Sequence, residues 1–107
     1  MASKNIIAIN DENFQREVLG SERPFMLELG AQWCGPCKAL DPIVERIADE
    51  HAGSLRVGKA DVDRAPELAR SLGIRGVPSV VVFKDGKELA RRLGLASRDA
   101  LMKLVPA

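Results

Sequence analysis

The only two cysteines of this chain, Cys34 and Cys37, lie at the junction of an apolar segment and a long amphipathic one. Residues 25–30 are almost continuously apolar, which is typical of a strand covered on both faces. After the cysteines, apolar residues recur in the i, i+3, i+4, i+7 pattern of a helix. A CxxC pair at such a junction is typical of a redox-active dithiol at a helix N-terminus. This feature therefore predicts a strand, a tight turn and a helix that together present two thiols.

Composition bounds the remaining possibilities. With 107 residues, of which 46% are hydrophobic, the chain is expected to form a single domain over residues 1–107. The net charge is +1 and charges of both signs are spread along the chain, so no nucleic-acid partner is expected. One Trp and no Tyr also argue against base stacking. The N-terminal segment fits no signal peptide and no stretch could span a bilayer, which predicts a cytoplasmic protein without membrane contact.

The pattern along the chain alternates strands and helices. Strands are predicted over residues 5–9, 25–30, 55–62, 80–83 and 87–93. Helices are predicted over residues 12–19, from the cysteines to about 50, over 65–72, and from 97 onward, with Pro42 expected to kink the second. Asp85 and Gly86 indicate a hairpin turn. A parallel βαβ start followed by an antiparallel hairpin predicts an α/β fold, a mixed sheet with helices on both faces.

At this level the chain resembles the thioredoxin family over essentially its whole length. The residues that carry the resemblance are the run WCGPCK at 33–38, Pro42, Lys59, the run GIRGVP at 73–78, and Gly94. The resemblance implies the thioredoxin fold with a five-stranded mixed sheet, and a cis bond between Val77 and Pro78. Two positions depart from the family pattern. Glu28 stands where the family has a buried aspartate, and Leu29 and Gly30 stand where it has an aromatic pair.

The resemblance also implies an activity, reduction of protein disulfides by dithiol–disulfide exchange. Cys34 would be the nucleophile, because the unpaired N–H groups and the dipole of a helix N-terminus favour a thiolate. Cys37, one turn further, would be the resolving thiol. Since no cation lies between the cysteines, moderate thiolate stabilisation is expected, which favours a reductant. The expected partners are a thioredoxin reductase as electron donor and disulfide-containing target proteins, with a monomeric chain, no cofactor and no metal.

Glu28 is a charged residue within an apolar strand. If the strand is central, burial raises the pKa of this carboxyl, which would suit it to accept the proton of Cys37. The alternative is a structural carboxylate paired with Lys59. Both residues are therefore candidates for the catalytic site.

A second group of residues is expected to bind the substrate around Cys34. In an extended target, the backbone could pair with that of Val77 beside the cis-proline. Leu93 and Leu95 could join this rim or belong to the core. The expected substrate-binding residues are Trp33, Gly35, Pro36, Ile74, Val77, Pro78 and Gly94.

Other interpretations of the cysteine pair remain open on the sequence. A CxxC pair could be half of a zinc site, but zinc normally takes four ligands, and His51 is the only histidine. A thiol oxidase or isomerase would use the same cysteines at a more oxidising potential. A non-catalytic binding module with the thioredoxin fold would keep the cysteines and turn over slowly.

Overall fold

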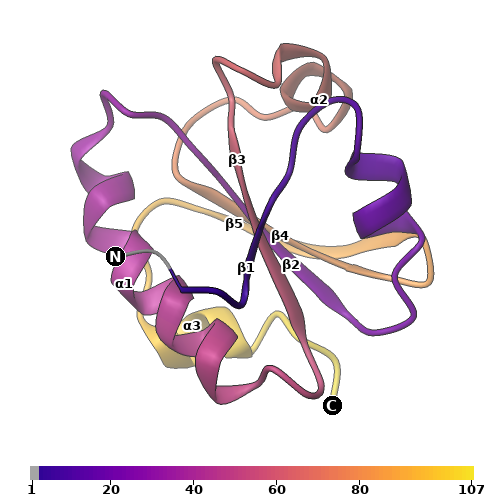
Figure 1. Ribbon diagram of the computed structural model, residues 1–107. Coiled ribbons are helices and arrows are strands. Elements are labelled where there is room, and N and C mark those ends of the chain that lie inside the picture. The colour runs from indigo at the N-terminus through magenta and orange to yellow at the C-terminus, as the bar shows by residue number, and fades with distance from the viewer. Residues whose placement is uncertain (1–2) are drawn as a thin grey trace.

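The computed structural model describes residues 3–107 and is built around one five-stranded sheet (Figure 1). The strands are β1 (Ile6–Ala8), β2 (Phe25–Gly30), β3 (Arg56–Asp61), β4 (Ser79–Lys84) and β5 (Lys87–Leu93), in the order β1-β3-β2-β4-β5. The helices are the π-helical turn η1 (Gln15–Leu19), α1 (Gly35–Glu50), α2 (Pro66–Ser71) and α3 (Arg98–Met102). β1, β3 and β2 run parallel, whereas β4 pairs antiparallel with β2 and β5. The predicted mixed sheet is confirmed.

The helices lie in two layers, with α1 and α3 on one face of the sheet and η1 and α2 on the other (Figure 1). Alternation along β2 sends Met26 into the core beneath α1 and Leu27 into the core on the α2 face. Glu28 follows Met26 by two residues, so its side chain points to the α1 face. The polar residue is thus placed in the layer that also carries the cysteines.

The first predicted helix, residues 12–19, is only partly confirmed. The Oδ1 atom of Asn10 accepts hydrogen bonds from the backbone N–H groups of Glu12 and Asn13, both at 2.9 Å. This cap begins the turn, but the segment then continues as the π-helical turn η1. Val18 is buried, and the Phe14 ring packs edge-on against Phe83 with centroids 5.6 Å apart.

The hairpin between β4 and β5 follows the sequence signal. Asp85 and Gly86 have φ angles of 54° and 78°, the left-handed conformation that a two-residue hairpin turn requires at both positions. β5 is the last strand of the sheet, and all of its residues except Ala90 are exposed.

Leu93 and Leu95 are not core residues. Their exposed fractions are 64% and 53%. The interpretation that placed them in the core is therefore wrong, because strand alternation alone does not distinguish an edge strand from a covered one. Within residues 3–107, no helix combines the length and the apolar character needed to cross a bilayer.

Candidate active site

The cysteines lie at the connection between β2 and the start of α1. Cys34 is the N-cap of α1, and its Sγ accepts a hydrogen bond from the backbone N–H of Cys37 at 3.2 Å. Gly35 and Pro36 form the first turn of the helix, where a proline costs nothing because the first N–H groups have no intrahelical partner. The two sulfurs form a disulfide across Cα atoms 5.3 Å apart. Helix dipole and free N–H groups favour negative charge on Cys34 when this bond opens.

Burial does not separate the two cysteines in this oxidised state. Each is 4% exposed, and Val62 and Val77 pack against the pair. The difference lies in what each sulfur adjoins. Cys37 borders a cavity inside the α1 face, whereas Cys34 is not among the residues that line it.

On the outer side of the disulfide, the expected substrate-binding loop lies beside the cysteines. The Val77–Pro78 bond is cis, as the resemblance implies. The N–H of Gly94 donates to the carbonyl of Pro78 at 2.8 Å, and Gly94 has a φ of 98° that favours glycine. The hydrogen bond joins the Val77–Pro78 loop to Gly94, so these two predicted segments form one surface.

Two other members of the predicted rim differ in exposure. The indole of Trp33 is 71% exposed, and its Nε1 donates to Oδ2 of Asp63 at 2.8 Å. Ile74 is half-buried and packs against the core on the α2 side. Trp33 therefore exposes apolar surface beside the cysteines, and Ile74 exposes less of it.

The carboxyl group of Glu28 is buried beneath the active-site segment. Its exposed fraction is 1%, and neither oxygen accepts a hydrogen bond. Its pKa is raised to about 8, chiefly by loss of hydration on burial, and next by the neighbouring Asp41, which acts both as a hydrogen-bond acceptor for the protonated form and as a negative charge. The charge of Lys59 acts in the opposite direction and is too weak to compensate. The expected burial and raised pKa of Glu28 are both found.

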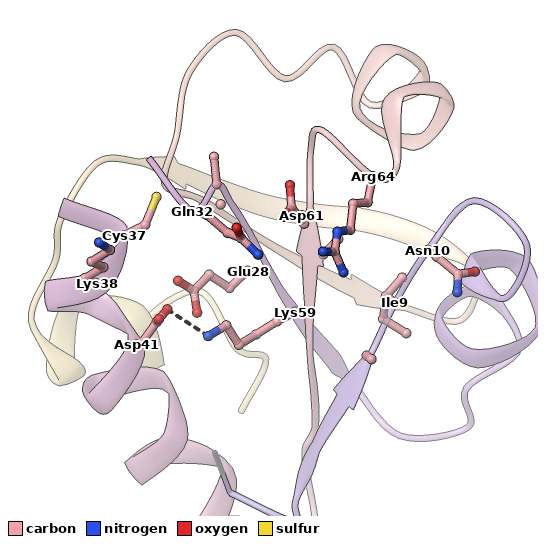
Figure 2. Close-up of a pocket in the computed structure, with 14 residues that line it drawn as sticks. Ile9, Asn10, Glu28, Gln32, Cys37, Lys38, Asp41, Lys59, Asp61 and Arg64 are labelled. Atoms are coloured by element: carbon pink, nitrogen blue, oxygen red, sulfur yellow. Dashed lines mark ion pairs between the residues drawn. The ribbon is translucent and has the colours of Figure 1, made fainter. Parts of the chain in front are cut away.

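Lys59 has a different partner from the one considered on the sequence. Its Nζ forms an ion pair with Oδ1 of Asp41 at 2.9 Å (Figure 2). Glu28 and Lys59 are register partners on neighbouring parallel strands, yet Glu28 makes no ion pair with it. The interpretation of Glu28 as a carboxylate paired with Lys59 is therefore wrong, because Asp41 on α1 lies closer to the ammonium group.

An open cavity of about 750 Å³ joins these groups. Figure 2 shows the carboxyl groups of Glu28 and Asp41 directed toward one another, with the Lys59 ammonium beside Asp41. Gly30 forms part of the wall, and a Cβ atom there would lie 3.2 Å from Sγ of Cys37. The missing side chain at this position thus leaves Cys37 at the edge of the cavity. The lining residues are Ala8, Ile9, Asn10, Glu28, Gly30, Ala31, Gln32, Cys37, Lys38, Asp41, Lys59, Ala60, Asp61 and Arg64.

Sequence reasoning missed Asp41 and Asp63. The signal for Asp41 is its i+4 spacing from Cys37, which places both on one side of α1. No local sequence pattern indicates the hydrogen bond of Asp63 to Trp33, because the two residues are 30 positions apart. Within residues 3–107, no three side chains of His, Cys, Asp or Glu are grouped as metal ligands.

Comparison with known proteins gives a consistent answer. Residues 5–107 match the family model described as Thioredoxin. The chain belongs to the thioredoxin family. It is 38% identical over 103 residues to Thioredoxin C-2 of Corynebacterium nephridii, covering 96% of this chain and 95% of that relative. It is 41% identical over 99 residues to a thioredoxin of Acidithiobacillus ferridurans, covering 92% of each chain.

Family membership confirms the main expectations of the sequence. The fold is the thioredoxin fold, and the protein is a thiol–disulfide oxidoreductase that reduces protein disulfides. Membership in this family implies a separate reductase as the electron source and disulfide-containing proteins as targets. The Cys34–Cys37 disulfide is the oxidised form of the pair that performs this exchange.

Proposed function

We propose that reduction of a target disulfide begins at Cys34 and is completed by Cys37, with Glu28 as the proton acceptor. The observation that carries this assignment is the position of Cys34 at the N-cap of α1, while Cys37 and Glu28 border the same cavity. The Cys34 thiolate attacks one target sulfur, and the other leaves as a thiolate and takes a proton. A mixed disulfide between Cys34 and the target results.

In the second step, Cys37 loses its proton to the Glu28 carboxylate and attacks Sγ of Cys34. The intramolecular disulfide forms, and the second target sulfur leaves as a thiolate. A pKa of about 8 for Glu28 lies close to the ordinary value of a cysteine thiol, about 8.5, so proton transfer between them costs little. Lys59 serves this step indirectly, because its ion pair with Asp41, 2.9 Å between Nζ and Oδ1, holds Asp41 beside Glu28.

The target is expected to dock on the outer side of the disulfide. The backbone of Val77 would pair with an extended segment of the target, as in strand addition. Gly35 and Pro36 are exposed in the first turn of α1, and these small residues leave the approach of a target to Cys34 open. The residues assigned to docking are Trp33, Gly35, Pro36, Ile74, Val77, Pro78 and Gly94.

Membership in the thioredoxin family supports a proposal for the electron donor and the cellular location. Thioredoxin reductase is the proposed electron donor, and the relatives that carry the name thioredoxin support this choice. We expect the protein to act in the cytoplasm as a monomer, in a single domain spanning residues 1–107. Size-exclusion chromatography with light scattering tests the oligomeric state directly.

The roles of the two cysteines are tested by trapping. Cys37→Ser should accumulate a mixed disulfide between Cys34 and a disulfide-containing protein substrate, because nothing resolves it. Cys34→Ser should accumulate none under the same conditions. Mass spectrometry of the trapped species identifies the bonded cysteine, and a bond to Cys37 in the unmodified protein would reverse the assignment.

The direction of the reaction is tested by a redox titration of Trp33 fluorescence against a thiol–disulfide buffer. Trp33 is the only tryptophan and adjoins Cys34, so one signal reports the disulfide. A midpoint below about −250 mV marks a reductant. A midpoint above about −200 mV would indicate an oxidase or isomerase. Absence of a reversible transition would indicate a binding module.

A further inference from the structure

Glu28 lines the open cavity, yet its carboxyl group has little contact with solvent of its own. Its exposed fraction is 1%, and neither carboxyl oxygen has a hydrogen-bond partner. Because its pKa is raised to about 8, the carboxyl is largely protonated at neutral pH and must lose that proton before it can accept the one from Cys37, as the proposed function requires. A buried acid with no partner would do so slowly.

Asp41 lies between this buried group and the surface. It follows Cys37 by one helical turn on α1, so both side chains lie on the same side of the helix. Its side chain is 32% exposed, and it lines the same cavity as Glu28 and Cys37. Figure 2 shows its carboxyl group facing that of Glu28. The Asp41 carboxyl group therefore lies next to both the buried Glu28 and the solvent.

Lys59 holds Asp41 in this position by an ion pair. The ammonium group lies 2.9 Å from Oδ1 of Asp41, and it carries only hydrogen-bond donors, so it cannot accept a proton from Glu28. The ion pair leaves the second oxygen of Asp41 available as an acceptor. A neutral Glu28 can donate its O–H to this oxygen, because Asp41 is the hydrogen-bonding neighbour that raises its pKa, and the two carboxyl oxygens have no partner in the described structure.

We propose that Asp41 is a positioning residue that relays the proton of Glu28 to water. The inference rests on the proposed role of Glu28. The thiol proton of Cys37 passes to Glu28, whose O–H then donates a hydrogen bond to Asp41. The proton moves to Asp41 and from there to a water molecule at the cavity mouth, which restores both carboxylates and leaves one hydronium ion in solvent.

Several other charges face this group, and they define the controls. Glu45, one turn after Asp41, also acts on Glu28 as a negative charge but does not line the cavity. Lys38, Asp61 and Arg64 line the cavity and complete its charged wall. Oε1 of Glu45 accepts the backbone N–H of Ser3 at 2.9 Å, which a glutamine can also do. Glu45→Gln therefore removes a charge of the same sign without removing a relay.

The test follows the resolution step with a chromogenic aromatic disulfide. This probe releases one thiol when Cys34 attacks it and a second when Cys37 resolves the mixed disulfide, so stopped-flow absorbance separates the two phases. Asp41→Asn should slow the second phase about tenfold. This is less than the full contribution of a positioned general acid or base, because Glu28 is still present. The first phase should keep its rate. The pH midpoint of the second phase should fall, because Glu28 loses a neighbouring negative charge.

Rescue distinguishes a relay from a structural role. Asp41→Ala should be slow in a non-buffering medium and should recover with added imidazole, which carries the proton in place of the missing carboxyl. Asp41→Glu should retain most of the wild-type rate. Glu45→Gln should leave the rate of the second phase unchanged and gain nothing from imidazole.

Two outcomes would overturn the inference. One is a second phase of wild-type rate and pH dependence in Asp41→Asn. The other is a slow Asp41→Ala that imidazole does not accelerate. Glu28→Gln separates these from failure of the proposed function. If Glu28→Gln resolves at the wild-type rate, the role of Glu28 itself is wrong. If it is slow, adding Asp41→Asn should cause no further loss, since both act on one proton.

Discussion

The two sides of the Cys34–Cys37 disulfide differ in chemistry: one is apolar and exposed, and the other carries carboxyl groups. On the outer side, Trp33, Leu93 and Leu95 are each more than half exposed and present apolar surface. On the inner side, Glu28 and Asp41 bring two carboxyl groups together in a cavity. Recognition of a partner depends on accessible area and shape, whereas proton transfer depends on exclusion of water. Substitutions on the inner side should therefore change stability and the rate of disulfide reduction, whereas substitutions on the outer side should change KM. Four predictions test this difference.

The largest effect is expected on the inner side, in the pH dependence of stability. Burial raises the pKa of Glu28 from 4.5 to about 8, so the folded protein binds a proton that the unfolded chain has released. The associated stability is fully present below pH 4.5 and is lost as pH rises toward 8 and above. The free energy of unfolding should therefore fall by roughly 5 kcal/mol over this range, at about 1.4 kcal/mol per pH unit.

Urea unfolding of the oxidised protein at a series of pH values measures this slope. The matched variant is Glu28→Gln, which should show a nearly flat profile between pH 5 and 9. Glu17, Asp49, Glu50 and Glu88 have pKa values lowered by their hydrogen-bonded partners, so their contributions are lost only on acidification and do not enter this window. A wild-type profile as flat as that of the variant would contradict the burial argument.

Next in size is the trade between stability and rate at Glu28. Glu28→Leu replaces two oxygens without hydrogen-bond partners by apolar surface of similar volume, so the fold should gain about 1–3 kcal/mol. Disulfide reduction should slow by about a hundredfold, because Cys37 loses its proton acceptor. Thermal unfolding and turnover with a protein substrate, measured across pH 6–8, test the two halves separately. Unchanged turnover across that range would remove Glu28 from the mechanism.

A smaller effect is expected on the outer side. Trp33→Ala removes an indole that is 71% exposed and available to a partner. The KM for a protein disulfide should rise by about tenfold, the loss typical of an aromatic contact of 1–2 kcal/mol, while kcat changes little. A small aromatic disulfide, which is too short to reach the indole, supplies the control. An equal loss with both substrates would show that Trp33 acts on the chemistry instead of on docking.

The smallest effect concerns how Trp33 is held. Asp63→Ala removes the acceptor of the indole N–H at 2.8 Å, an exposed hydrogen bond whose net contribution is about 0.5 kcal/mol. The KM for a protein disulfide should rise about twofold, and the fluorescence anisotropy of Trp33 should fall. Asp63→Asn, which keeps an oxygen acceptor, should retain the wild-type values. An anisotropy unchanged in both variants would mean that the bond does not restrain the ring.

Much of this molecule could be predicted from its sequence, and the reasons are local. Burial of Glu28 follows from a charged residue between apolar neighbours in a central strand, and the Asp85–Gly86 turn follows from the backbone that those residues favour. The cis bond before Pro78 came only through family resemblance, since most such bonds are trans.

What could not be predicted depends on contacts between distant segments. The ion pair of Lys59 with Asp41 joins β3 to α1, and sequence spacing does not show which carboxylate lies nearer the ammonium group. The exposure of Leu93 depends on β5 being the last strand in the sheet. Both outcomes are set by tertiary arrangement, which overrides a pattern read along one segment.

The pairing of β2 with β3 sets Glu28 beside Lys59 at equivalent positions of two parallel strands. A slip of one residue in β2 would turn the carboxyl into the apolar layer against η1 and α2, where Val81 and Phe83 of β4 lie. There it would have neither an acidic neighbour to take its proton nor a cation to balance its charge. Glu28 thus favours the correct alignment of the sheet over the slipped one, because burial of a carboxyl without those neighbours costs more free energy.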